Sequence, residues 1–245
     1  MRTKHTPGFL LQSALLLLMC LTAGAQEYIE KRDFQEDAGS LSLLYKGMIT
    51  PSLKVAANGN QYWQSPEFRR GSITLDGRTY DNVLVNFDAS RQLVLTTAYI
   101  GAPAVALPSE KVAGFSMEEK RFVKIEGSPG IPDGFYHEVY AGQSAFYMHV
   151  QKPLETSFTN VNGTFIGYED PDYDSRKVDF YYYKTSYYLR DALGHFRQIR
   201  TRNALLRQFP KQKRALRRHM SDVGMTSRKV ALELYAAELL RFAEQ

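Results

Sequence analysis

The chain has 245 residues, of which 31 are basic and 26 acidic, so its formal net charge is +5. This small positive excess argues against a dedicated nucleic-acid binder, and the length allows one sizeable core or two small ones. The aromatic content of 13%, with 16 Tyr and 14 Phe, favours strands, because flat rings pack well on a pleated surface.

The first 25 residues have the pattern of a signal peptide for export. A basic start precedes an uncharged apolar run over residues 14–21, and a small-x-small motif follows at residues 23–25. We therefore expect cleavage between Ala25 and Gln26. The apolar run is shorter than the roughly 20 residues that span a bilayer, and no later run approaches that length, so we expect no transmembrane segment.

The only cysteine, Cys20, lies inside this segment. Lipid attachment usually requires a small residue before the cysteine, and Met19 stands there, so we expect ordinary cleavage. Cleavage would remove the only thiol, and with it disulfides, cysteine nucleophiles and thiolate metal sites. The expected product is an exported protein of the cell envelope, either periplasmic or associated with the outer membrane.

The remaining chain is predicted to be mainly β. Residues 26–40 are polar and form a loose N-terminal lead, whereas residues 41–200 alternate in short runs that predict an antiparallel β domain. We expect a meander, arranged as a sandwich or as a curved, partly open barrel, in which Asp76-Gly77 is a hairpin turn. We expect residues 152–176 to be a long loop, with a short strand near 163–167. The other strands are predicted at 71–75, 83–87, 93–97, 104–107, 112–117, 121–125, 135–140, 145–151, 177–183, 185–190 and 195–199.

The apolar period changes to a helical one after Thr201. Residues 201–245 therefore predict two or three C-terminal α-helices packed on the β domain. Gly224 fits a helix stop, and Thr226 or Ser227 fits the cap of the last helix.

One part of the β domain has a distinctive sequence, GSITLDGRTYDNV from Gly71 to Val83, followed by Asn86-Phe87-Asp88. Together with the basic, Leu-rich C-terminal segment and the short final helix, it resembles small exported proteins of unknown function that are common in Bacteroidota. The resemblance implies a β-rich envelope protein. It implies no activity, cofactor or catalytic residue.

Carboxylates and histidines are the first candidates for chemistry. A glycan hydrolase needs two facing carboxylates, for which the chain offers Asp76, Asp81, Asp88 and Glu138. Asp76 and Asp88 also stand where turns use an Asp side chain to accept backbone N–H groups, which is the interpretation we favour.

His137 and His149 lie on consecutive predicted strands. A hairpin turn over residues 141–144 would make them cross-strand neighbours, able to share a metal ion or a proton. No metal-binding spacing supports a site, and the chain lacks GxSxG, P-loop and GxGxxG motifs. The sequence therefore assigns no catalytic residue, no metal and no cofactor.

A band of tyrosines is a candidate ligand platform. Its members Tyr181, Tyr183, Tyr187 and Tyr188 lie on predicted strands, so the rings would face both sides of a sheet. One face would be buried, and the other would offer a stacking surface for sugars or an apolar ligand. A two-sided core strand beneath the helices is the simpler interpretation.

The stretch between Asp191 and Asp222 contains no acidic residue and nine basic ones, which we call the basic segment. An amphipathic basic helix can lie on an anionic membrane or meet an acidic partner, and it can also be a solvated face or be answered by acids of the same chain. The clearest candidates for such a patch are Arg207, Lys211, Arg214, Arg217 and Arg218. The other members are Arg197, Arg200, Arg202 and Lys213.

These features favour a non-enzymatic binding module whose partner is an envelope protein, a lipid or a glycan, with no nucleic acid involved. The alternatives are a glycan hydrolase and a carrier for an apolar ligand. Paired carboxylates in a cleft would favour the hydrolase, and an apolar cavity lined by the tyrosines would favour the carrier.

Overall fold

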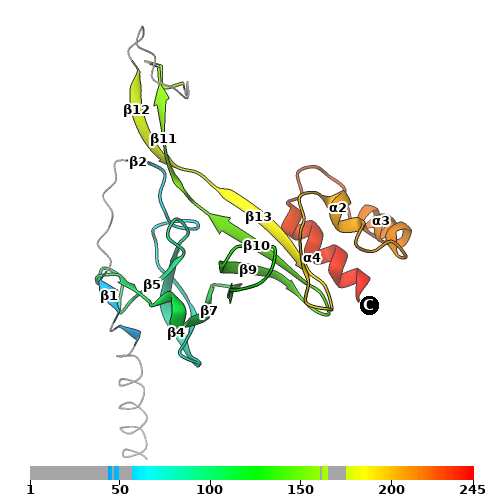
Figure 1. Cartoon of the computed structure of the whole chain (residues 1–245), viewed down its shortest axis with the longest axis horizontal. Coiled ribbons are helices and arrows are strands. Elements are labelled where there is room, and N and C mark those ends of the chain that lie inside the picture. The colour runs from blue at the N-terminus through cyan, green and yellow to red at the C-terminus, as the bar shows by residue number, and fades with distance from the viewer. Residues whose placement is uncertain (1–43, 46, 50–56, 161, 165–174) are drawn as a thin grey trace, which may run out of the picture. The chain divides into compact units, whose positions relative to one another are not determined.

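The computed structural model of the chain describes most of the predicted β domain and all of the C-terminal helices (Figure 1). The chain divides into two units, Met1–Lys46 and Gly47–Gln245, and the elements below belong to the second. The described residues are 44, 45, 47–49, 57–160, 162–164 and 175–245.

Three expectations from the sequence fall on other residues. The predicted signal segment with its cleavage site at Ala25 and Gln26 lies outside the described residues, as does the polar lead over 26–40. Most of the short strand expected near 163–167 also lies outside them.

An antiparallel sheet of eleven strands, which does not close on itself, forms the main part of the fold. The prediction of a mainly β chain followed by C-terminal helices is confirmed. A 3₁₀ helix, Ser109–Lys111, precedes the sixth strand in sheet order. The strands in sheet order are β1 (Met48–Ile49), β6 (Val105–Ala106), β5 (Leu93–Thr97), β4 (Arg78–Asp88), β3 (Arg69–Leu75), β7 (Val112–Met117), β8 (Lys120–Ile125), β9 (Gly134–Ala141), β10 (Ala145–Gln151), β13 (Lys184–Arg190) and β14 (Phe196–Gln198).

The turn between β3 and β4 forms where the sequence places it. Asp76 and Gly77 both have positive φ, at 50° and 77°, which is what a tight hairpin turn requires. Alternate residues of the flanking strands are buried, including Ile73 and Val85. The period of two in the sequence is therefore the consequence of one face packing on a core.

Strands β10 and β13 continue beyond the large sheet as a single long hairpin (Figure 1). Gln151 pairs with Lys184, and three residues further along each strand Leu154 pairs with Tyr181, so the register is preserved. The continuation consists of β11 (Leu154–Thr159) and β12 (Arg176–Tyr181), with β2 (Ala57–Asn58) added parallel to β12. The expectation of a loop from residue 152 is therefore wrong for β11.

The physical reason is that β11 is stabilised by its ladder to β12 and not by a core. Its first three residues are exposed, so no alternation of buried positions marks it in the sequence. The predicted strand over 177–183 is also wrong at its end, because β12 stops at Tyr181. Pro153, on the opposite strand, has no N–H for the ladder at this point.

A buried lysine holds the hairpin at this interruption. Lys152 is 4% exposed, and its ammonium donates hydrogen bonds to the Tyr62 carbonyl (2.9 Å) and to the Asn60 side-chain oxygen (3.3 Å). The same Nζ lies 4.6 Å from the centre of the Tyr183 ring. Burial lowers the pKa of Lys152, while the nearby Asp88 acts in the opposite direction. The long hairpin is thus fastened to the segment that precedes β3.

Three helices follow the sheet: α2 (Arg202–Leu206), α3 (Lys213–Asp222) and α4 (Leu232–Ala243). Their apolar residues form one cluster with Phe146 and Leu189 of the sheet, and α4 contacts β9 and β10. Gly224, with φ of 71°, follows α3 as the predicted stop. Within the described residues, we find no helix with the length and apolar character that crossing a membrane requires.

The last helix begins later than the sequence suggests. Neither Thr226 nor Ser227 caps it, because α4 starts at Leu232 after Ala231. In the segment before α4, the guanidinium of Arg202 donates to the carbonyls of Met225 (3.2 Å), Thr226 (3.3 Å) and Val230.

Carboxylates on α4 and just after it fasten the helices. Glu233 accepts from the Tyr187 hydroxyl of β13 (2.9 Å), and Glu238 contacts His219 of α3 (2.7 Å). Glu244 accepts from the Tyr140 hydroxyl (2.8 Å) and, in the turn between β9 and β10, from the backbone N–H groups of Gln143 (2.9 Å) and Ser144 (2.7 Å). Each of these three carboxylates therefore connects its segment to another element of the fold.

We expect the substitution Glu244→Gln to lower the free energy of unfolding by about 1 kcal/mol at pH 7, the low end for hydrogen bonds to a partly solvated charge. Burial opposes ionisation of Glu244, but the hydrogen bonds from Ser144, Tyr140 and Gln143 outweigh it, so its pKa lies below the usual 4.5. The stabilisation is therefore present at neutral pH and is lost as the pH falls below about 4.5.

Denaturant unfolding at pH 7 and at pH 3.5 tests this prediction. The difference between the wild type and Glu244→Gln should shrink at the lower pH. The matched control is Glu119→Gln, which removes an exposed carboxylate without a hydrogen bond among the described residues. An equal loss of stability in the control would contradict the role of Glu244.

Candidate anion-binding surface

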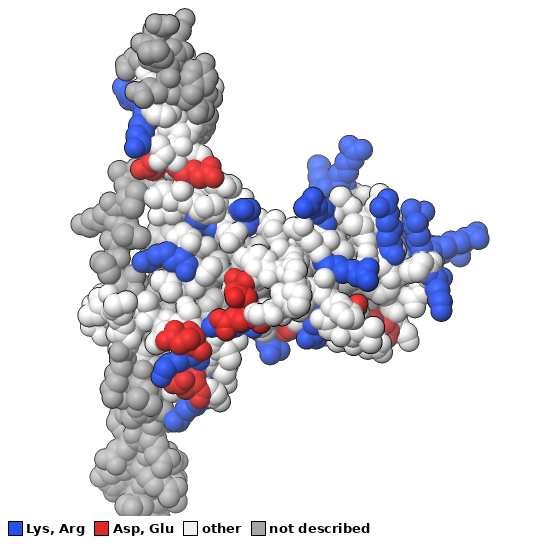
Figure 2. Space-filling view, in the orientation of Figure 1, with Lys and Arg blue, Asp and Glu red and all other residues white. Residues whose placement is uncertain are grey.

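The positive charge of the basic segment is concentrated over the C-terminal helices. Figure 2 shows Lys and Arg side chains gathered there, at the right of the view. Among the described residues, none of the nine basic side chains forms an ion pair. Arg197 and Arg200 bond to glutamine side chains, and Arg202 bonds to backbone carbonyls. The charge is therefore not neutralised by acids within the described part of the chain.

The carboxylates on α4 and just after it are already engaged, whereas Asp222 of α3 forms no ion pair with a described residue. Glu238 pairs with His219 and with Arg241 (2.6 Å), neither of which is one of the nine basic residues. Glu233 and Glu244 bond to the sheet, as described above. Asp191, at the edge of the segment, lies 3.5 Å from the His195 ring nitrogen.

Helix α3 presents its basic residues on two sides. Leu216 and Met220 are buried against the sheet and α4. At 100° per residue, Arg214 and Arg218 point away from Leu216, whereas Arg217 points to one side. These two directions correspond to two separate hollows.

The first hollow, which we call the arginine pocket, lies among the three helices and the segment between α3 and α4. It has a volume of 710 Å³. Four arginines line it, together with Tyr235, and no acidic residue or lysine does. The four are Arg200, Arg202, Arg217 and Arg228.

The second hollow, which we call the outer hollow, has a volume of 640 Å³ and lies along the other side of α3. Lys211, Arg214 and Arg218 line it together with Asp222 and His219. The imidazole of His219 stacks on the Phe242 ring, with 4.0 Å between the ring centres.

The patch predicted from the sequence is thus divided by the fold. Lys211, Arg214 and Arg218 share the outer hollow, Arg217 lines the arginine pocket, and Arg207 is exposed at the end of α2 and lines neither. Sequence reasoning missed Arg228 and Tyr235 as pocket residues. The only signal is that Arg228 follows the helix stop at Gly224, and this does not indicate which way it points.

The tyrosine band is also divided. Tyr188 is 5% exposed and packs with Tyr136 and Tyr147, while Tyr187 bonds to Glu233 beneath α4. These two rings therefore belong to the core, which was the simpler interpretation. Burial raises the pKa of Tyr187, and the bond to Glu233 adds to the effect.

The other two tyrosines lie at the interruption of the long hairpin. Tyr183 is 53% exposed and donates a hydrogen bond to the Trp63 carbonyl. Burial raises the pKa of the half-buried Tyr181, and the charge of Asp88 contributes further. The four rings do not form one platform, because two are in the core and two lie at the interruption of the long hairpin.

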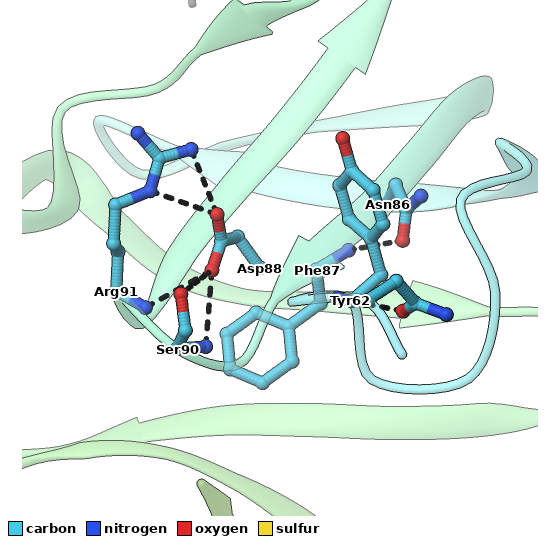
Figure 3. Close-up of polar contacts among 7 residues, drawn as sticks. Tyr62, Asn86, Phe87, Asp88, Ser90 and Arg91 are labelled. Atoms are coloured by element: carbon cyan, nitrogen blue, oxygen red, sulfur yellow. Dashed lines mark hydrogen bonds and ion pairs between the residues drawn. The ribbon is translucent and has the colours of Figure 1, made fainter. Parts of the chain in front are cut away.

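The candidate carboxylates are occupied in different ways. Asp88 is fully buried and accepts from the N–H and hydroxyl of Ser90 (3.0 and 2.7 Å) and from the N–H and Nε of Arg91 (3.0 and 2.8 Å), as Figure 3 shows. Asp76 pairs with Lys111 (3.0 Å). Asp88 is therefore the anchor of a turn, as favoured from the sequence.

The remaining two carboxylates lie on different strands. Glu138, on β9, pairs with Arg121 (3.2 Å). Asp81 is exposed on β4. Glu138 and Asp81 therefore both lie outside the turn that Asp88 anchors.

The two histidines are not cross-strand neighbours. Phe146 pairs with Tyr140, but Tyr147 pairs with Glu138, so Val139 is an extra residue in β9. This bulge pairs His149 with Tyr136 and Met148 with His137. The imidazoles consequently point to opposite faces of the sheet and do not face a shared metal ion.

Each imidazole is packed among aromatic rings. His149 stacks on Tyr136, with 4.6 Å between ring centres, and His137 lies 5.3 Å from the Phe122 ring. Burial lowers the pKa of each to about 4, and the positive charges of Lys184 near His149 and Lys120 near His137 act in the same direction. Both rings are neutral at physiological pH.

We expect the free energy of unfolding to fall as the pH is lowered from about 6.5 toward 4. The unfolded chain binds protons at these histidines at higher pH than the folded chain does, so protonation favours unfolding. The substitution His149→Phe keeps the stacked ring and removes one titrating group, so its pH dependence should be smaller. Denaturant titrations between pH 7 and pH 5 measure this, with the exposed His195→Gln as control. A slope unchanged by His149→Phe would contradict the assignment.

Comparison with known proteins returned no matching family model, no similar curated protein and no similar solved structure. The feature with the clearest chemistry is the unpaired positive charge around α3.

Proposed function

We propose that the chain is a non-enzymatic binding module of the cell envelope, which attaches to an anionic surface through its C-terminal helices. The observation that carries the proposal is that none of the nine basic residues forms an ion pair with a described acid. A row of unpaired, mostly exposed cations repels itself, and an anionic partner relieves that repulsion.

The outer hollow is the part of this surface that best fits attachment. Lys211, Arg214 and Arg218 are exposed. Arg214 and Arg218 project from the side of α3 opposite Leu216, whose face is already used against the sheet, and Lys211 lies just before the helix. Docking through these side chains requires no apolar insertion and no rearrangement of the helices. The expected partner is a membrane leaflet containing anionic lipids, for which each Lys or Arg near the surface contributes about 1 kcal/mol.

Export is part of this proposal and is supported by the signal-like pattern of residues 1–25. We also propose that the chain belongs to the exported Bacteroidota proteins that the Gly71–Val83 sequence resembles. In the envelope, a patch of this kind meets lipids and charged polymers and does not meet nucleic acid. The positions of Asp88 in a turn and of Tyr187 and Tyr188 in the core favour binding over the hydrolase and carrier alternatives.

We expect the substitutions Lys211→Gln, Arg214→Gln and Arg218→Gln, made together, to weaken binding to phosphatidylglycerol-containing vesicles by about 100-fold at low salt, because three contributions of about 1 kcal/mol are lost. Co-sedimentation of the purified chain with these vesicles measures the effect. Vesicles of phosphatidylcholine alone should bind neither protein.

A matched triple variant of the long hairpin serves as the control. Arg176→Gln, Lys177→Gln and Lys184→Gln remove the same charge from exposed positions outside the helices. This variant should bind the anionic vesicles as the wild type does. Equal weakening in both triple variants, or no binding by the wild type, would overturn the proposal.

A further inference from the structure

We propose that the arginine pocket is a separate ligand site that binds a phosphate group carried on an apolar or aromatic body. It differs from the outer hollow in its walls, in its floor and in the residues that are free to bind. The inference does not depend on attachment to a membrane.

The pocket has a wall that is built and held by one of its own arginines. Arg202 donates to three carbonyls of the segment between α3 and α4, and its guanidinium lies 4.9 Å from the centre of the Tyr235 ring. These contacts fix the segment that carries Arg228 opposite α3. Arg202 is therefore part of the scaffold, and its donors are largely used.

Two other arginines have free donors. Arg217 and Arg228 are exposed, and neither has a hydrogen bond or an ion pair with a described residue. Arg200 adds a third guanidinium, which bonds to the Gln198 side chain (3.1 Å). Several guanidinium groups thus line one hollow without an acid among its lining residues.

The chemistry of these cations favours phosphate. The planar fork of a guanidinium matches two oxygens of a phosphate, and a phosphate has enough oxygens for more than one fork. A carboxylate has only two oxygens, which a single arginine can satisfy. All basic residues of the lining are arginines and none is lysine, as expected where several guanidinium groups bind one phosphate.

The floor of the pocket indicates what the phosphate is attached to. Leu206, Met220 and Tyr235 line it and are almost fully buried, so their outer surfaces form an apolar base beneath the charged rim. A volume of 710 Å³ is within the usual range for a small-molecule site and exceeds the need of a bare phosphate ion. The ligand expected here has a phosphate head and an apolar or aromatic body.

Binding of phenyl phosphate to the purified chain tests the site directly. With ¹³C-methyl-labelled methionine, the resonance of Met220 in the pocket should shift on titration, while that of Met117 in β7 should not. Phenol at the same concentrations should leave Met220 unmoved. A shift with phenol equal to that with phenyl phosphate, or no shift of Met220 at all, would overturn the proposal.

Two double variants locate the binding. Arg217→Gln with Arg228→Gln should weaken the affinity for phenyl phosphate at least about tenfold, because both free forks are lost. Arg214→Gln with Arg218→Gln, which removes the same charge from the outer hollow, should change it less than about twofold. Equal affinities in the two variants would overturn the pocket assignment. Failure of vesicle docking through the outer hollow would leave this result unaffected.

A short-chain, water-soluble phosphatidic acid distinguishes the two sources of such a ligand. Tighter binding of this lipid than of phenyl phosphate would support a lipid headgroup, and the reverse order would support a soluble organophosphate. Absence of binding by both probes would overturn the proposal.

Discussion

The attachment of the C-terminal helices by carboxylates on and next to α4 is the constraint on which the surface chemistry depends. Glu233 bonds to β13, Glu238 to α3, and Glu244 to the turn between β9 and β10. Because these acids hold the fold together, they do not neutralise the basic segment. The structure thus separates charge within a few helical turns: the acids of α4 and Glu244 bond to the sheet or to α3, and most of the cations face solvent. A solvated basic patch and a well-anchored helix are two results of the same arrangement.

The long hairpin depends on a different device. Its two strands keep one register from β10 and β13 into β11 and β12, even though Pro153 interrupts the ladder. At that point Lys152 replaces ladder contacts with hydrogen bonds to the preceding segment and a contact with Tyr183. A buried ammonium tolerates this position because it has polar acceptors and an aromatic face around it.

The sequence predicts those elements whose residues alternate or repeat against a core. Most strands of the large sheet, the turn at Asp76-Gly77 and the stop at Gly224 were predicted on that basis. Strand β11 was not, because its first residues are exposed on both faces. The predicted pairing of the two histidines was wrong because one extra residue, Val139, shifts the register. No local sequence pattern indicates such a bulge.

The candidate site was predictable only in part, for a related reason. The run of basic residues is visible in the sequence, but its division between two hollows follows from the direction in which α3 faces. The arginine pocket also depends on Arg202, whose guanidinium bonds to the carbonyls of Met225 and Val230 in the segment before α4. Such a contact between residues 23 or more positions apart follows from packing and has no local signature.

The central claim is that the basic residues around α3 form no ion pair with a described acid, and the salt dependence of α3 tests this most directly. Hydrogen exchange of α3 amides would be measured between about 10 and 100 mM NaCl, over which the Debye length falls from about 30 to about 10 Å. Amides of β10 serve as the internal reference. Screening of unpaired, mutually repelling cations predicts slower exchange in α3 as salt is added. Faster exchange would mean that salt breaks internal ion pairs, and it would contradict the claim.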